Sequence, residues 1–173
     1  MAVYSHIENN EISKFLHNYE IGSLIKVEGI LEGIENTNYK ITTSKNKYIL
    51  TIFEKRVQSE EVPFFINLKN HLIKKKFLCP KPISDINGDI IKTLQGKKCI
   101  LISFLEGYKA KNITNMHCEQ VGNILALFHK NTQDFNEKRM NSMNYAQWEK
   151  IYNICQILSS NQNKYKSLIP IIK

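Results

Sequence analysis

Three strand-like segments joined by short polar turns constrain the fold of this chain more than any other feature. Apolar and β-branched residues dominate 23–31, 39–43 and 48–53. The turns between them, 33–38 and 44–47, are rich in Asn, Ser, Lys and Gly. Such short connections leave no room for a crossover helix, so consecutive strands must run antiparallel. The sequence therefore predicts a three-stranded meander.

A helix is predicted to follow the meander, over 59–76. Ser59 is suited to the N-cap, and Glu60 and Glu61 favour the positive end of the helix dipole. Two prolines in 79–82 push the residue before each away from helical angles, so the helix must end before them. The apolar stripe expected to face the sheet consists of Phe64, Phe65, Leu68, Leu72 and Ile73.

The remaining segments complete an α+β pattern. A short amphipathic helix is predicted over 8–19, and Asn87-Gly88 and Gly96-Lys97 are turn signals before an apolar strand over 99–105. After Gly107 only helical patterns occur, with Thr114 as a candidate N-cap and a weaker helix over 145–158. We expect an antiparallel sheet of about five strands with one packed helix, followed by the start of a helical domain.

Composition excludes several classes of protein. The net charge of +8 comes mainly from dispersed lysines, with two arginines among 24 basic residues, so a nucleic-acid binder is the weaker interpretation. Four cysteines lie far apart without a C-x-x-C pair, which predicts buried free thiols and no metal site. No leader pattern and no apolar run of about 18 residues occurs, so we expect a cytoplasmic protein without a membrane anchor.

Residues 28–39 could cover the phosphates of ATP. Two glycines permit close approach of the backbone, and Asn and Thr side chains can donate hydrogen bonds to anionic oxygens. Taken alone, the segment is a weak signal, because an ordinary hairpin turn is the more frequent explanation of such a pattern. The P-loop pattern is absent.

Several short motifs, taken together, resemble one family. They include Glu-Gly-Ile-Glu-Asn-Thr-Asn-Tyr at 32–39, Tyr-Ile-Leu-Thr-Ile-Phe-Glu-Lys-Arg at 48–56 and Cys-Pro-Lys-Pro at 79–82. Further matches in order and spacing lie at 1–4, 62–65, 103–107 and 121–129. The set resembles the homoserine kinases of the aminoglycoside-phosphotransferase-like superfamily, which have a protein-kinase-like fold. The resemblance extends through about Trp148.

This resemblance implies a domain organisation and an activity. Residues 1–106 would form the nucleotide-binding N-lobe of a kinase, and 107–173 would begin its helical C-lobe. The implied reaction is ATP-dependent phosphorylation of L-homoserine to O-phospho-L-homoserine, a step of threonine biosynthesis, with Mg²⁺ as the metal. ATP and L-homoserine are the implied small-molecule partners.

The resemblance also implies the residues of the nucleotide site. Turn 33–38 would cover the phosphates, the backbone of 103–105 would form the hinge that binds adenine, and Ile30 and Ile49 would line the adenine pocket. The alternative for 103–105 is a buried edge strand, and the alternative for Ile30 and Ile49 is plain sheet core. The residues assigned to nucleotide binding are Gly33, Glu35, Asn36, Thr37, Asn38, Ile49, Thr51, Lys55, Ser103, Phe104 and Leu105.

Two departures from the family pattern concern charge. Thr51 stands where the third kinase strand usually offers Lys or Arg to the phosphates, and Lys55 or Arg56 could substitute for it. The helix expected over 59–76 has carboxylates only at its start, so the usual Glu partner is missing as well. His71 and His129 are interpreted as structural, with His129 buried. Asp134 is interpreted as a chance imitation of a magnesium-binding motif.

The catalytic groups of a kinase are not recognisable in this sequence. None of Asp85, Asp89 and Asp134 lies in an H-x-D-x-x-x-x-N setting. We therefore expect the catalytic Asp and the metal ligands beyond Lys173, no metal site in this chain, and an inactive chain that needs a separate C-terminal half. The alternative is a non-catalytic nucleotide-binding or interaction module.

Overall fold

The computed structural model describes residues 4–54, 57–141 and 144–160. The chain forms two compact units, residues 1–137 and 138–173. The first unit contains a six-stranded antiparallel sheet, and the second contains one described helix, α4 (Tyr145–Ser160). The sheet confirms the expected α+β class.

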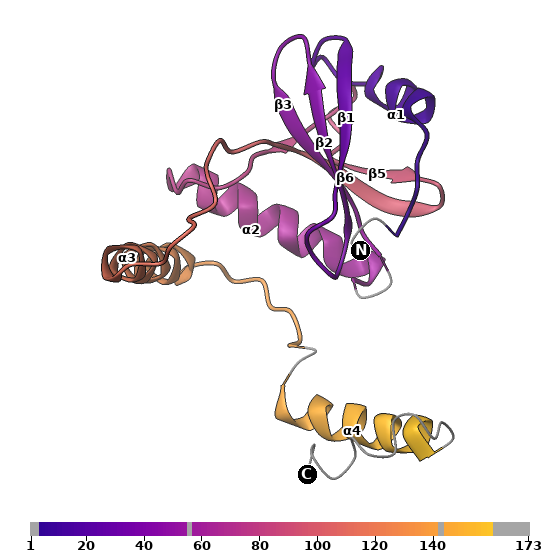
Figure 1. The fold of residues 1–173 in the computed structure, drawn as a ribbon. Coiled ribbons are helices and arrows are strands. Elements are labelled where there is room, and N and C mark those ends of the chain that lie inside the picture. The colour runs from indigo at the N-terminus through magenta and orange to yellow at the C-terminus, as the bar shows by residue number, and fades with distance from the viewer. Residues whose placement is uncertain (1–3, 55–56, 142–143, 161–173) are drawn as a thin grey trace. The chain divides into compact units, whose positions relative to one another are not determined.

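The strands follow the predicted meander and hairpins (Figure 1). Their order across the sheet is β1-β2-β3-β6-β4, with β5 also paired to β6. The bounds are β1 Leu24–Ile30, β2 Thr37–Thr43, β3 Lys47–Ile52, β4 Pro82–Ile83, β5 Ile91–Leu94 and β6 Lys97–Ser103. The short β4 adds a strand to the expected set, because the extended segment after the second helix pairs with β6. Pro82 is tolerated there, since β4 is an edge strand.

Side chains of the sheet alternate between two faces, which we call the α1 face and the α2 face. Helix α1 (Asn9–Leu16) covers the α1 face, where its buried Ile12, Phe15 and Leu16 belong to the main core. The residues of β2, β3 and β6 in the same core are Tyr39, Ile41, Tyr48, Leu50, Ile52, Cys99 and Leu101. The next residues along each strand point to the α2 face, as the period of two requires.

Helix α2 (Val62–Lys74) covers part of the α2 face, on the opposite side of the sheet from α1 (Figure 1). A 3-10 turn, η1 (Ser59–Glu61), precedes it. Buried Val62 and Ile66 contact Ile100, and partly buried Phe53, Val57, Ile90, Ile91 and Ile102 surround them. The predicted packing of this helix on the sheet is confirmed, but the expected apolar stripe is wrong in its residues. Val62 and Ile66 face the sheet, and of the predicted stripe only Leu72 is buried.

Turn chemistry fixes the second half of the sheet. Gly88 adopts φ +87, and Gln95 and Gly96 adopt φ +48 and +75, so the chain turns at both predicted places. The turn at Gly96 closes the β5–β6 hairpin, whereas the two-residue hairpin predicted at Asn87-Gly88 is wrong, because β4 and β5 both pair with β6 and not with each other. Within the first turn the buried Asp85 carboxylate accepts the backbone N–H groups of Asn87 and Asp89, each at 2.9 Å. It also accepts a hydrogen bond from Lys92 at 2.6 Å.

Helix α3 (Asn115–Thr132) begins at the predicted N-cap. The Thr114 hydroxyl accepts the His117 N–H, and the His117 ring accepts the Thr114 N–H in return. One side of α3 presents an apolar groove of about 570 Å³. It is lined by His117, Gln120, Val121, Ile124, Leu125 and Phe128. None of the helices in the described part of the chain combines the length and apolar character needed to cross a lipid bilayer.

Candidate functional site

The turn between β1 and β2 is exposed but fixed at its end. Residues 31–35 are solvent-exposed, and Gly33 adopts φ +111, a conformation that other residues rarely take. The Ile34 carbonyl accepts a hydrogen bond from the Tyr4 hydroxyl at 3.1 Å. The Asn36 side-chain carbonyl accepts the backbone N–H of Glu54 at 3.3 Å. An exposed turn held in this way can offer backbone N–H groups to an anion.

A neutral polar pair lies on the α2 face beside this turn. Asn38 and Thr51 are cross-strand partners, and the Thr51 hydroxyl donates to Asn38 Oδ1 at 2.8 Å. Asn38 Nδ2 reaches the Asn36 carbonyl at 3.4 Å. This pair occupies the place where the resemblance leads one to expect a cation.

Apolar side chains flank that pair on the same face. Ile30 is the cross-strand partner of Asn38, and Ile49 lies two residues before Thr51 on β3. Ile102, the partner of Ile49, continues the row onto β6. All three are partly buried. The row therefore gives a planar, weakly polar ligand a surface on which to lie.

The predicted hinge follows directly from β6. The Ser103 N–H donates to the Lys81 carbonyl at 2.8 Å, and the Phe104 N–H donates to the Lys47 carbonyl at 3.2 Å. Leu105 lies beyond these contacts and is 41% exposed. β6 ends at Ser103, and the backbone groups that the predicted hinge would offer to adenine are the Ser103 carbonyl and the Leu105 N–H. Such an acceptor and donor match the amino and ring nitrogens of adenine.

Positive charge gathers at this end of the sheet around Phe104. Lys40 Nζ lies 5.1 Å from the centre of the Phe104 ring, and Lys47 Nζ lies 5.8 Å from it. Lys47 also forms an ion pair with Glu106 at 2.7 Å. These cation–π contacts hold the Phe104 side chain against β2 and β3.

Thr37 differs from the other residues assigned to nucleotide binding. Its side chain is fully buried on the α1 face, and its hydroxyl donates to Glu54 Oε1 at 2.7 Å. The hydroxyl therefore faces away from Asn38 and Thr51. Gly33, Glu35 and Asn36 lie in the turn, whereas Lys55 falls outside the described residues.

The histidines and Asp134 form contacts around the helices. His71 Nε2 lies 2.8 Å from the Asn131 carbonyl and 3.2 Å from the Asp134 carboxylate. The hydrogen bond from Lys75 holds the pKa of Asp134 below its ordinary value. These contacts join α2 to the end of α3. The expectation that His129 is buried is wrong: it is exposed, because no described segment covers that part of α3.

The described residues hold no group of three or more His, Cys, Asp or Glu side chains suited to a metal ion. The four cysteines are free thiols. The expectation that they are buried holds for Cys99, whose pKa burial raises to about 12, whereas Cys118 and Cys155 are exposed.

Comparison with known proteins places this geometry in context. Residues 26–153 match the sequence profile of the phosphotransferase enzyme family. A homoserine kinase of Sinorhizobium medicae is 40% identical over 152 residues, which cover 88% of this chain and 47% of the relative. A homoserine kinase of Bartonella henselae is 40% identical over 157 residues, covering 91% and 49%. The chain thus spans about half the length of the curated relatives it matches.

Solved structures show the same architecture at low sequence identity. A microcompartment-associated aminopropanol kinase aligns with a TM-score of 0.64 at 14% identity, covering 80% of this chain and 46% of that one. A spectinomycin phosphotransferase, solved with ADP and spectinomycin, aligns with a TM-score of 0.59 at 15% identity, covering 94% and 55%.

Proposed function

This chain belongs to the phosphotransferase enzyme family, and on that premise we propose that it is the nucleotide-binding part of an ATP-dependent kinase for L-homoserine. Its fold is α+β and protein-kinase-like, as its structural neighbours show. The proposed N-lobe is 1–106, and the proposed start of the C-lobe is 107–173. Both lie on a chain that covers about half of its relatives.

The observation that carries the proposal is the meeting of three features on one face of the sheet. The register of β1, β2, β3 and β6 sets where these features lie. They are the exposed turn with Gly33, the isoleucine row beside the Asn38–Thr51 pair, and the proposed hinge at 103–105. In the proposed complex adenine bonds to the Ser103 carbonyl and the Leu105 N–H and lies on Ile30 and Ile49. The triphosphate extends toward the turn.

The phosphates would meet mostly uncharged donors in this chain. Asn36, Asn38 and Thr51 can contribute amide and hydroxyl groups, and the turn contributes backbone N–H groups through Gly33 and Glu35. Lys55 remains a proposed cationic contact. Mg²⁺ would neutralise phosphate charge in the assembled kinase. We propose that the ligands of Mg²⁺ lie in the half of the kinase that this chain does not cover.

The acceptor and the catalytic groups are proposed from the relatives. Both homoserine kinases extend over about twice the matched length, so we propose that the proton-accepting Asp and the homoserine site belong to the half that this chain does not cover. The product would be O-phospho-L-homoserine, used in threonine biosynthesis in the cytoplasm. A C-terminal half would complete the enzyme.

A nucleotide titration tests the proposal. The purified chain should bind a fluorescent ATP analogue weakly, and unlabelled ATP should displace it. Asn36→Ala and Asn38→Ala should each weaken binding by about ten- to hundredfold, the loss expected for one hydrogen bond to a charged group. Lys111→Ala, an exposed residue outside the site, should leave binding unchanged. Equal effects of all three variants would argue against the phosphate-covering turn.

An activity assay distinguishes a kinase half from a non-catalytic module. We expect no homoserine-dependent ADP release from this chain alone, and recovery when a second polypeptide supplies the remaining half of the relatives' length. Homoserine-dependent ADP release by the chain alone, abolished by a substitution within it, would show that the active site has been misplaced. Nucleotide binding without recovered activity would favour the non-catalytic module.

A further inference from the structure

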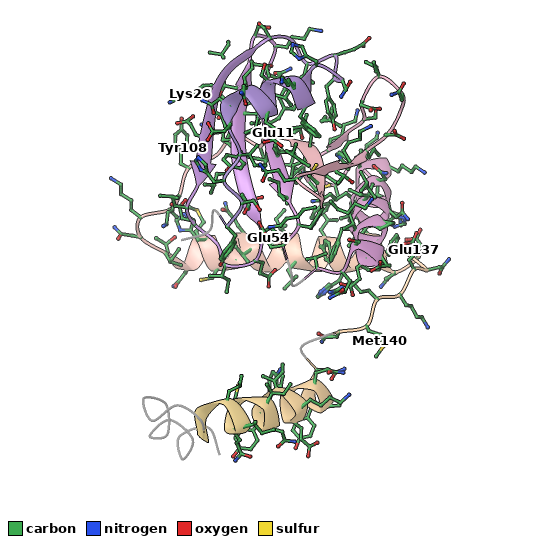
Figure 2. All side chains as sticks on the ribbon, turned by 90° about the vertical axis from the view of Figure 1, so that its right-hand side faces the viewer. Glu11, Lys26, Glu54, Tyr108, Glu137 and Met140 are labelled. Atoms are coloured by element: carbon green, nitrogen blue, oxygen red, sulfur yellow. The ribbon has the colours of Figure 1, made fainter. Side chains whose placement is uncertain are left out.

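A buried carboxylate lies behind the phosphate-covering turn, on the α1 face. The Glu54 side chain, labelled in Figure 2, is only 9% exposed although it lies two residues after the end of β3. Its partner Lys97 opens β6 and forms an ion pair with Glu54 Oε2. Nothing in the proposed nucleotide contacts uses this pair, since those contacts lie on the other face of the sheet.

The Glu54 carboxylate connects segments that are distant in sequence. Its Oε1 accepts hydrogen bonds from Ser5 Oγ and Thr37 Oγ1, both at 2.7 Å. Lys97 Nζ donates to Ser5 Oγ at 2.7 Å as well as to Glu54. The backbone N–H of Glu54 donates to Asn36 Oδ1 at 3.3 Å. One residue thus joins the N-terminal segment, the end of the turn, β3 and β6.

The hydroxyl of Thr37 has its hydrogen-bonding capacity filled by this network. It accepts the backbone N–H groups of Tyr4 and Ser5 at 3.0 and 3.1 Å and donates to Glu54. The N-terminal segment in turn contacts the turn, because the Tyr4 hydroxyl donates to the Ile34 carbonyl at 3.1 Å. The network therefore reaches the turn at Ile34, at Asn36 and at Thr37.

Stability alone is a weak reason for such a network. A buried ion pair carries a desolvation penalty, and apolar residues of similar size often serve the stability of a fold as well. Charged hydrogen bonds are, however, short and directional, so a carboxylate with three donors fixes the groups around it more closely than apolar packing does. The segment held by this network is the turn at 34–37, which we propose binds the nucleotide phosphates and must therefore keep one conformation.

We propose that Glu54 is a positioning residue, whose carboxylate holds residues 34–37 from behind so that the turn is preorganised for the nucleotide phosphates. This inference rests on the proposed nucleotide site. It assigns Thr37 to the same network, with its hydroxyl holding the turn rather than binding the ligand.

The test compares two substitutions that remove buried charge. Glu54→Gln keeps the shape and removes the charge. Asp85→Asn does the same at a second buried carboxylate–lysine pair, whose hydrogen bonds stay within residues 85–92. Amide hydrogen exchange of residues 31–37 and affinity for ATP are measured at a temperature where each variant is fully folded by circular dichroism. A difference between the variants then reports positioning and not global unfolding.

For Glu54→Gln we expect at least about tenfold faster exchange in the turn and at least about tenfold weaker ATP binding, as for the loss of one charged hydrogen bond. Asp85→Asn should lower the melting temperature and change neither readout. Thr37→Ser, which keeps the hydroxyl, should bind ATP like wild type, and Thr37→Val should behave like Glu54→Gln. If Glu54→Gln does not fold, Thr37→Val and Thr37→Ser decide the question.

The outcomes separate the two proposals. If the wild-type chain binds ATP and Glu54→Gln shows the same amide exchange and the same ATP affinity as wild type, the positioning role alone is overturned. Loss of affinity equal in Glu54→Gln and Asp85→Asn would also overturn it, as a general structural effect. A wild-type chain that binds no ATP would overturn the proposed function and with it this inference.

Discussion

Replacing Thr51 with Lys should strengthen ATP binding if the phosphates lie under the β1–β2 turn. Thr51 is partly buried on the α2 face, beside Asn38 and one strand from the turn. A lysine at this position restores the cation that the resemblance leads one to expect. The partner variant Thr42→Lys makes the same change on the same face of β2, but at the end that pairs with Lys47, away from the turn.

The size of the effect follows from two opposing contributions. A charged hydrogen bond to phosphate contributes about 1.5–3 kcal/mol. Removal of the Thr51 hydroxyl takes away its 2.8 Å hydrogen bond to Asn38. The loss of this bond costs about 1 kcal/mol. The net gain of about 0.5–2 kcal/mol corresponds to about two- to thirtyfold tighter ATP binding.

Isothermal titration or displacement of a fluorescent analogue measures this gain. ATP binding by Thr51→Lys should tighten and become more sensitive to salt, whereas adenosine binding should stay the same, because adenosine carries no phosphate. Thr42→Lys should give only the small gain expected from one added surface charge. Weaker ATP binding by Thr51→Lys, or equal gains for both variants, would refute the placement of the phosphates.

Three further predictions concern stability and surface. Leu101→Ala removes a fully buried side chain from the α1-face core and should lower the free energy of unfolding by about 2–5 kcal/mol in urea titrations, against less than about 0.5 kcal/mol for the exposed Leu105→Ala. Burial by itself raises the pKa of Glu54, but hydrogen bonds from Lys97, Ser5 and Thr37 outweigh it and hold the pKa below its ordinary value. The stabilising contribution of the ionised Glu54 is therefore complete above the unfolded pKa of about 4.3 and is lost as pH falls through the lower folded pKa. In urea titrations, Glu54→Gln should lose less free energy of unfolding than wild type between pH 6 and about pH 3. An equal loss in both proteins would contradict this. Leu125→Glu, placed in the exposed apolar groove of α3, should reduce self-association measured by analytical ultracentrifugation, and no change would show that the groove takes no part in it.

Much of the fold could be predicted because its signals are local. The meander follows from strand patterns with short turns, the turns at 87–88 and 95–96 from their glycines, and the start of α3 from Thr114. Each of these features depends on residues a few positions apart, so periodicity, capping and turn chemistry suffice to find it. The short β4 was predicted only as extended, since its two residues become a strand solely by pairing with β6.

The sequence by itself determined the order of the elements and the α+β class, and its resemblance to a kinase family is the reason we propose a nucleotide site at 33–38 and 103–105. Only the tertiary structure decided on which face each side chain acts. The hydroxyl of Thr37 is drawn to Glu54 while its neighbour Asn38 pairs with Thr51 on the other face, and the carboxylate of Glu54 meets Ser5 and Lys97 across 49 and 43 residues of chain. Hydrogen bonds over such separations leave no periodic signal, because they exist only once the strands have paired in register and the N-terminal segment has folded across them.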